Sequence, residues 1–257
     1  QKFIGWQKLA QRFFASAQIH ADRTDFEPVS VGNFLLGETV KICLFDHDAI
    51  LLGNLPQRRP HHCGPFTQAQ GYAPKHPMVL ANNPKAQVPV LVDGDLTLFD
   101  STVINEYLED LFPEPRLVPV DPYERARMRA WRQFIDEVPT SAIRIPSFNA
   151  FVRHIWGPMS EEDFRDFTGR MPLRKHFYRK MGPEGFRKDD VDEAIEKLRA
   201  TCERAEKSLS TGPWLCGEMF TLADVSLTPS IVRMVDLDLA HLWADLPRFT
   251  DWFRRIQ

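Results

Sequence analysis

The sequence has no long hydrophobic run. No stretch of about 18 apolar residues is present, which argues against a membrane-spanning helix, and the N-terminus does not read as a signal peptide. Internal repeats and low-complexity tracts are also absent. These absences favour a globular protein that does not work within a membrane.

Cysteine is scarce for a chain of 257 residues. The four cysteines show no disulfide-framework spacing, so a reducing cytoplasm is the simplest location; they are Cys43, Cys63, Cys202 and Cys216. His61 and His62 directly precede Cys63, but no second ligand pair stands at zinc-like spacing. We therefore expect no metal site.

Charge of either sign is not in strong excess. Lys and Arg number 32 against 35 Asp and Glu, giving a net charge of −3 and a pI near 6.3. This balance argues against nucleic acid as a main partner. Basic clusters at residues 125–132 and 174–179 are interleaved with acidic or apolar groups, which predicts helix faces.

Residues 85–112 carry the most information. Two apolar runs, residues 88–92 and 96–99, are joined through Asp93 and Gly94, which predicts a β-hairpin. Pro89 cannot donate to a ladder, so its strand should be an edge strand or hold an unusual peptide bond. A cis Val88–Pro89 bond would turn the Val88 backbone outward, where it could pair with an extended ligand.

A helix is predicted to follow Asp100 and Ser101. Its apolar positions recur at helical spacing, at Val103, Ile104, Tyr107, Leu108, Leu111 and Phe112, with Glu106, Glu109 and Asp110 opposite. Either Asp100 or Ser101 is simply an N-cap, or the helix N-terminus binds a carboxylate while Asp100 receives an ammonium group. The second arrangement would clamp an amino-acid end such as a γ-glutamyl group.

Residues 87–94 and 100–108 resemble the glutathione-site motifs of the cytosolic glutathione transferases. The resemblance implies a thioredoxin-like N-terminal α/β domain with a mixed sheet, followed by an all-helical C-terminal domain. It also implies glutathione as co-substrate, with Val88 and Pro89 at its cysteinyl part and Asp100 and Ser101 at its γ-glutamyl part. Gln87 and Lys85 are further candidates near the same groove.

The second half is predicted to be helical. Asp121 and Pro122 are start signals for a long helix, with one face formed by Ala126, Ala130, Trp131, Phe134, Ile135 and Val138. Another helix is predicted over residues 189–209. Thr221 and Asp224 have capping-box spacing, and residues 212–224 resemble the loop and capped core helix of the transferase helical domain.

Residues 121–131 and 172–176 are similar to a bacterial branch of the family. That branch includes glutathione-dependent β-aryl etherases acting on lignin-derived aromatics. The resemblance as a whole covers about residues 78–257 and implies a homodimer. Aromatic residues of the helical half either line a second-substrate site or form core, and we favour core; they are Trp131, Phe134, Phe148, Phe151 and Trp156.

The catalytic residue is not recognisable. Residues 39–47 resemble the first strand of a thioredoxin-like domain, after which the family places a Ser, Tyr or Cys that favours the glutathione thiolate. Residues 48–65 contain no Ser or Tyr. His47, Asn54 and Cys63 are weak substitutes.

The first 77 residues leave alternatives open. Residues 1–38 are an extension or an atypical start, or they supply the first helix and second strand, which would make Ser16 a remote catalytic candidate. A third hypothesis is that residues 1–77 were altered, for example by a reading-frame change. The predicted domains are residues 39–115 and 121–257, with the boundary in the proline-rich joint between them.

The predicted function is attack of the glutathione thiolate on a hydrophobic electrophile of aromatic character, by conjugation or ether cleavage. The second substrate would lie between the domains. The alternative is a non-catalytic protein of the same fold that binds glutathione or a protein partner.

Overall fold

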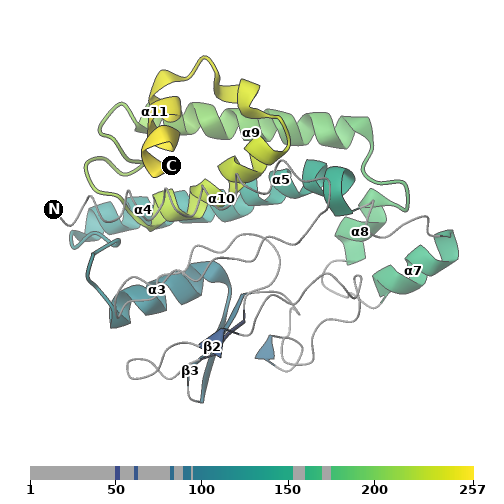
Figure 1. Ribbon diagram of the computed structural model, residues 1–257, viewed down its shortest axis with the longest axis horizontal. Coiled ribbons are helices and arrows are strands. Elements are labelled where there is room, and N and C mark those ends of the chain that lie inside the picture. Colours follow the sequence, from purple (N-terminus) through teal and green to yellow (C-terminus); the bar gives the residue numbers. More distant parts are fainter. Residues whose placement is uncertain are drawn as a thin grey trace.

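The structure is a computed structural model that describes residues 50–52, 61–62, 82–83, 89–93, 95–152, 160–169 and 175–257. A small sheet and one helix form one layer, and the long helices of the second half of the chain form a second layer beside it (Figure 1). No helix within these ranges is both long and apolar enough to cross a membrane.

The sheet is mixed, as predicted. Its strand order is β2-β1-β3-β4, with β1 parallel to β3 and the other two pairs antiparallel. The strands are β1 (Ile50–Leu52), β2 (His61–His62), β3 (Val90–Asp93) and β4 (Leu96–Phe99). The β3–β4 hairpin lies where the apolar runs predicted it.

Of the two alternatives for the strand at Pro89, the edge strand is wrong, whereas the unusual peptide bond lies outside the described residues. β3 lies between β1 and β4, so it is an internal strand. Pro89 directly precedes Val90, the first residue of β3. Its missing N–H therefore removes no bond from the ladder, and an internal strand tolerates proline at this point.

Helix α3 (Ser101–Leu111) packs on the hairpin through one part of its apolar face. Ile104 and Leu108 are buried against Leu91, whereas Val103 and Leu111 are exposed. Glu109, expected on the solvent face, is buried; its Oε1 atom accepts hydrogen bonds from the N–H groups of Leu117 (2.8 Å) and Val118 (3.2 Å). That carboxylate fixes the loop leaving the helix.

Helix α4 (Pro122–Glu137) begins as predicted. The Asp121 side chain accepts hydrogen bonds from the N–H groups of Tyr123 and Glu124, and Pro122 occupies the first turn. The predicted core face is right at Trp131 and Ile135, which are buried, and wrong at its two alanines. Ala126 and Ala130 are exposed, and the buried face consists of Met128, Trp131, Arg132 and Ile135.

The segment that follows α4 forms a second, smaller core. Helix α5 (Pro139–Ser147) runs into the π-helix η2 (Phe148–Val152), and α7 (Glu161–Gly169) and α8 (Lys175–Met181) follow. Asn149 ties η2 to the chain before α9, because its amide donates to Phe186 O (2.9 Å) and accepts from Phe186 N (2.8 Å). The buried members of this core are Phe148, Phe164, Tyr178, Met181 and Phe186.

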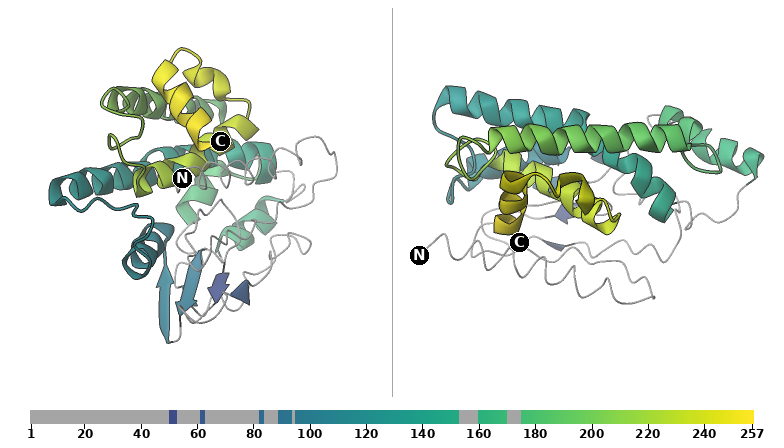
Figure 2. Two further views of the ribbon diagram at one scale, coloured as in Figure 1. Left: turned by 60° about the vertical axis from the view of Figure 1, so that its left-hand side comes forward. Right: turned by 90° about the horizontal axis from the view of Figure 1, so that it is seen from above.

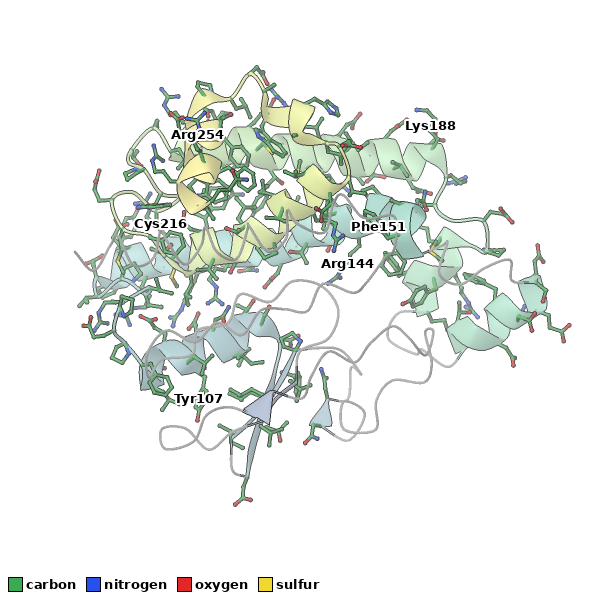
Figure 3. All side chains as sticks on the ribbon, in the orientation of Figure 1. Tyr107, Arg144, Phe151, Lys188, Cys216 and Arg254 are labelled. Carbon is green, nitrogen blue, oxygen red and sulfur yellow. The ribbon has the colours of Figure 1, made fainter. Side chains whose placement is uncertain are left out.

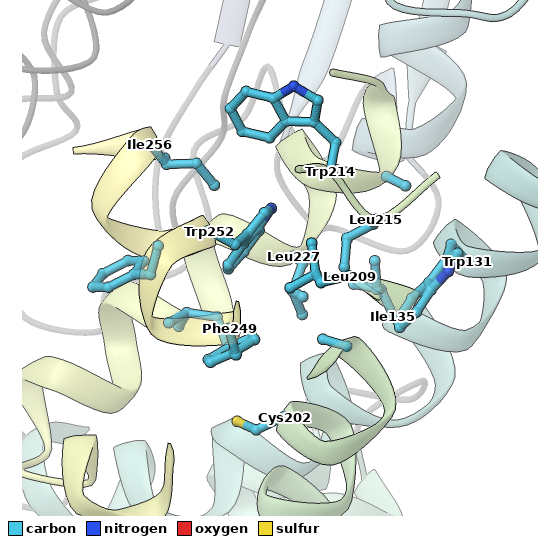
Figure 4. Close-up of a cluster of buried hydrophobic side chains, with 14 of the residues drawn as sticks. Trp131, Ile135, Cys202, Leu209, Trp214, Leu215, Leu227, Phe249, Trp252 and Ile256 are labelled. Carbon is cyan, nitrogen blue, oxygen red and sulfur yellow. The ribbon is translucent and has the colours of Figure 1, made fainter. Parts of the chain in front are cut away.

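The main core lies among the long helices. Helix α9 (Lys188–Ser208) spans this half of the molecule (Figure 2), and α10 (Leu222–Asp236), η3 (Ala240–Trp243) and α11 (Pro247–Ile256) complete it. Phe249 and Trp252 stack at 5.2 Å inside this core (Figure 4). The capping box of Thr221 and Asp224 is present, as predicted, and α10 continues through Pro229.

Candidate functional site

The turn between β4 and α3 has an unusual backbone. Asp100 has φ 70° and ψ 120°, a conformation that non-glycine residues rarely adopt and that costs on the order of 1–3 kcal/mol. The helix begins here, because Ile104 N donates to Asp100 O (3.0 Å). Asp100 occupies the N-cap position, yet its side chain makes no cap hydrogen bond. Simple capping therefore does not account for this residue.

The first turn of α3 suits a carboxylate. The N–H groups of Ser101, Thr102 and Val103 have no partner within the helix, since they precede the first intrahelical bond, and the helix dipole makes this end positive. The first turn carries no acidic side chain of its own. With the Asp100 carboxylate next to this positive end, the two neighbouring charges match a zwitterionic amino-acid group.

The hairpin register brings the two predicted halves of the site together. Val90 pairs with Phe99 across the hairpin. Pro89, one residue before Val90, and Asp100, one residue after Phe99, therefore flank the same end of the hairpin, next to the start of α3. Lys85, Gln87, Val88 and the Val88–Pro89 peptide bond lie outside the described residues.

Side chains of α4 hold this end of α3. Thr102 Oγ1 donates to Asp136 Oδ2 (2.8 Å), and the Arg132 guanidinium donates to Thr102 O (2.7 Å) and to Glu106 Oε1 (2.8 Å). The sequence predicted none of these contacts, and it assigned Arg132 only to a basic cluster on a helix face. The signal that locates it is the stripe of Met128, Trp131, Arg132 and Ile135, which share one helix face.

Burial makes the charged form of the Arg132 guanidinium less favourable. The Arg132 side chain is only 1% exposed, and desolvation lowers the pKa of its guanidinium from the ordinary value, although Glu106 and Asp136 oppose the shift. An arginine nevertheless stays charged near neutral pH. The site therefore contains a buried positive charge directly behind the first turn of α3.

The aromatic residues fall into two groups. Trp131 and Phe148 are buried, as the preferred interpretation held, and Phe134 packs at the margin of the main core with the Arg204 guanidinium 3.9 Å from its ring. Phe151 is half-buried, with the Arg233 guanidinium 5.2 Å from its ring. Figure 3 shows Phe151 and Arg144 on the side of the helical layer that faces the sheet.

The structure does not describe the sequence candidates for a thiol-activating group. Ser16, His47, Asn54, Cys63 and Trp156 are outside the described residues. Two other cysteines are unsuited to nucleophilic chemistry. Burial raises the pKa of Cys202 to about 12 and that of Cys216 to about 11, so both are protonated thiols near neutral pH.

Family models match both halves of the chain. Residues 65–116 match the glutathione S-transferase N-terminal domain, and residues 188–255 match the glutathione S-transferase C-terminal domain. The β3–β4 hairpin and the start of α3 thus lie within the first match, and α9, α10 and all but the last residue of α11 lie within the second. The chain belongs to the glutathione transferase superfamily, with a thioredoxin-like domain followed by a helical domain.

The relatives include the predicted bacterial branch. Protein LigF of Sphingobium sp. strain SYK-6 is 33% identical over 148 residues, which cover 56% of this chain and 57% of LigF. The crystal structure of β-etherase LigF superimposes with a TM-score of 0.61 at 29% identity, covering 68% of this chain and 76% of that one. Similarity to the β-etherase branch is therefore present in both sequence and structure.

Other relatives come from elsewhere in the superfamily. Glutathione S-transferase U8 of Arabidopsis thaliana is 36% identical over 100 residues, covering 38% of this chain and 41% of the relative. A probable maleylacetoacetate isomerase of Vibrio cholerae is 30% identical over 163 residues, which cover 62% of this chain and 63% of the relative. In each of these matches, as in that to LigF, the chain spans less than two thirds of the curated relative.

Proposed function

We propose that this protein is a glutathione transferase, in which the glutathione thiolate attacks a hydrophobic aromatic electrophile by conjugation or ether cleavage. One observation carries the proposal: because Val90 pairs with Phe99, Pro89 and Asp100 flank the same end of the hairpin, next to Ser101 at the start of α3. This arrangement lies within the segment matched by the N-terminal family model.

The site fits the γ-glutamyl end of glutathione. The α-carboxylate would accept hydrogen bonds from Ser101 and the N–H groups of the first turn of α3, and the ammonium group would pair with the Asp100 carboxylate. The Val88 backbone, next to Pro89, would pair with the cysteinyl part as a strand does. Gln87 and Lys85 would lie along the same groove.

The second substrate would lie between the sheet layer and the helical layer. Similarity to β-etherase LigF supports an aromatic ether as one candidate class. Phe151 is half-buried on the helical side facing the sheet (Figure 3), which suits an aromatic ligand better than the buried Trp131 and Phe148 do. Fold alone does not select the reaction within this superfamily.

Calorimetric titration tests the clamp. We expect the protein to bind glutathione and to bind cysteinylglycine, which lacks the γ-glutamyl group, at least about tenfold more weakly, because the charged end contributes the strongest hydrogen bonds. Ser101→Ala and Asp100→Asn should weaken glutathione binding. Ser210→Ala is the control, because Ser210 lies on the helical layer and its hydroxyl donates to Lys207 O.

Turnover separates the enzyme from a non-catalytic binding protein. The protein would be assayed with glutathione and a panel of aromatic electrophiles and β-aryl ethers, with product detected by mass. Formation of a glutathionyl product supports the transferase. Tight glutathione binding without product across the panel would leave only the binding protein, an alternative that the relatives named above do not favour.

We also propose a cytoplasmic homodimer, which is the arrangement typical of the family. The cysteine pattern supports the location. Exposed apolar side chains on α3 and at the start of α4 support self-association; they are Val103, Leu111, Val120 and Tyr123.

A further inference from the structure

Arg132 is an unusual residue to find inside the helical layer. Its side chain is among the largest fully buried ones in the described part of the chain, together with Trp252 and Phe249. A buried guanidinium is costly unless its charge is paired and its N–H groups are hydrogen-bonded. An apolar side chain would fill the same space without that cost.

The contacts of Arg132 reach out of its own helix. Nη2 donates to Thr102 O (2.7 Å) and Nη1 donates to Glu106 Oε1 (2.8 Å), so the planar fork holds two successive turns of α3. Nε lies 3.4 Å from Ser226 Oγ on α10. The guanidinium thus links α3 to two helices of the other layer.

Arg132 contacts α3 at its first turn, through the Thr102 carbonyl. Thr102 directly follows Ser101, and its N–H belongs to the same first turn that would receive the ligand carboxylate. A bond to the Thr102 carbonyl fixes the orientation of that turn. The positive charge of Arg132 also lies behind the turn, where it adds to the positive end of the helix dipole.

We propose that Arg132 is a positioning residue for the γ-glutamyl clamp. It holds the first turn of α3 at a fixed place against the helical layer, so that the N–H groups are aimed at the incoming carboxylate without any contact between Arg132 and the ligand. Glutathione affinity then depends on a side chain of the helical layer. This inference rests on the proposed function.

Three variants test the proposal. Arg132→Met keeps most of the volume but removes the charge and the fork, and Arg132→Lys keeps the charge without the fork. Arg129→Met is the matched control. Both side-chain hydrogen bonds that the structure gives Arg129 go to Glu106 (3.3 and 2.7 Å), the carboxylate that Arg132 also uses, and its side chain is 55% exposed.

We expect Arg132→Met to raise the Kd for glutathione at least about tenfold and Arg132→Lys to raise it about threefold, since charge-assisted bonds orient the site. Arg129→Met should stay within about twofold. In steady-state assays, the KM for glutathione should rise in the Arg132 variants, while the KM for the electrophile and kcat at saturating glutathione stay unchanged. A general packing defect would not produce that split.

The outcomes separate the two proposals. Wild-type protein that binds no glutathione overturns the proposed function and this inference together. Two results would overturn only the role of Arg132. In the first, a folded Arg132→Met variant binds glutathione as tightly as the wild type does. In the second, Arg129→Met raises the Kd for glutathione as much as Arg132→Met does. If circular dichroism shows that Arg132→Met does not fold, Arg132→Lys decides, and a wild-type Kd in that variant overturns the proposal.

Discussion

Asp224 shows how a single buried residue organises the helical layer. Its carboxylate is fully buried and accepts hydrogen bonds from Leu215 N, Thr221 N, Thr221 Oγ1 and Trp252 Nε1 at 2.8–3.2 Å. Burial raises the pKa of Asp224, and these donors oppose the shift because they favour the charged form. The residue thus joins the start of α10 to the preceding loop and to α11.

Removing that carboxylate should be severely destabilising. Asp224→Ala leaves the buried N–H groups of Leu215 and Trp252 without their acceptor, and we expect the free energy of unfolding to fall by about 3–5 kcal/mol. Urea denaturation measures the change. Asp251→Ala, at an exposed position on α11, is the control and should change stability by less than about 0.5 kcal/mol. A loss below about 1 kcal/mol for Asp224→Ala would contradict this role.

The buried thiols give a second prediction at the residue scale. Because burial raises the pKa of Cys202 to about 12 and that of Cys216 to about 11, both should resist alkylation at pH 8 in the folded protein and react in urea. Peptide mapping by mass spectrometry distinguishes them from Cys43 and Cys63. Rapid alkylation of Cys202 in the folded protein would contradict the burial of this thiol.

The raised thiol pKa values should make the free energy of unfolding depend on pH. A thiol whose pKa is higher in the folded state stabilises the protein below its unfolded pKa of about 9.0, and this contribution is lost as the pH rises toward about 12. The free energy of unfolding of the wild type should therefore fall above pH 9, and Cys202→Ala should reduce that fall. An identical alkaline slope in both proteins would contradict the assignment.

At the scale of elements, Asp190 connects α8 to α9. Lys180 Nζ lies 2.9 Å from Asp190 Oδ1 and Arg187 Nε lies 3.5 Å from Oδ2. The hydrogen bond from Lys180 is the main reason that the pKa of Asp190 lies below its ordinary value of 3.8. The carboxylate is buried although its two partners are exposed.

This pair should be sensitive to acid. A carboxyl group whose pKa is lowered by folding contributes stability above its unfolded pKa, and the contribution is lost as the pH falls through the folded pKa. Asp190→Asn should therefore lower the urea midpoint at pH 7, and its difference from the wild type should shrink below pH 3.8. Asp189→Asn, at an exposed position, is the control. A pH-independent difference would exclude the ion pair as its cause.

Local sequence signals predicted the elements that local chemistry determines. The hairpin, the start of α4 at Asp121, and the capping box of Thr221 all lie where residue types and spacing placed them. These features depend on neighbours within a few residues. The proposed γ-glutamyl clamp is also local, since β4 leads directly into α3, and the sequence therefore predicted Pro89, Asp100 and Ser101 as one candidate site.

Features that depend on distant segments were predicted wrongly or not at all. Pro89 does not mark an edge, because β1, from much earlier in the chain, pairs with β3. Arg132 is buried because Thr102 and Glu106 on another helix satisfy its guanidinium, and this places Ala130 in solvent. The spacing of Met128, Trp131 and Ile135 places Arg132 on the same face of α4, but it does not show which groups pair with its charge.

At the scale of the whole molecule, the proposed homodimer is testable. Light scattering coupled to size exclusion should give twice the mass of the 29.7 kDa chain. Tyr123→Lys, at a side chain that is 71% exposed, should shift the population toward monomer, because burying a lysine charge in an apolar interface is costly. Val235→Lys on α10 is the control. A monomeric wild type at micromolar concentration would contradict the proposal.

The central claim is that the end of the β3–β4 hairpin and the first turn of α3 together hold the γ-glutamyl group of glutathione. A crystal structure of the protein grown with glutathione tests this most directly. The account predicts the α-carboxylate against Ser101 and the first-turn N–H groups, the ammonium group at Asp100, and the cysteinyl backbone beside Pro89. Glutathione bound elsewhere, or this end of the hairpin occupied by the protein's own side chains, would contradict it.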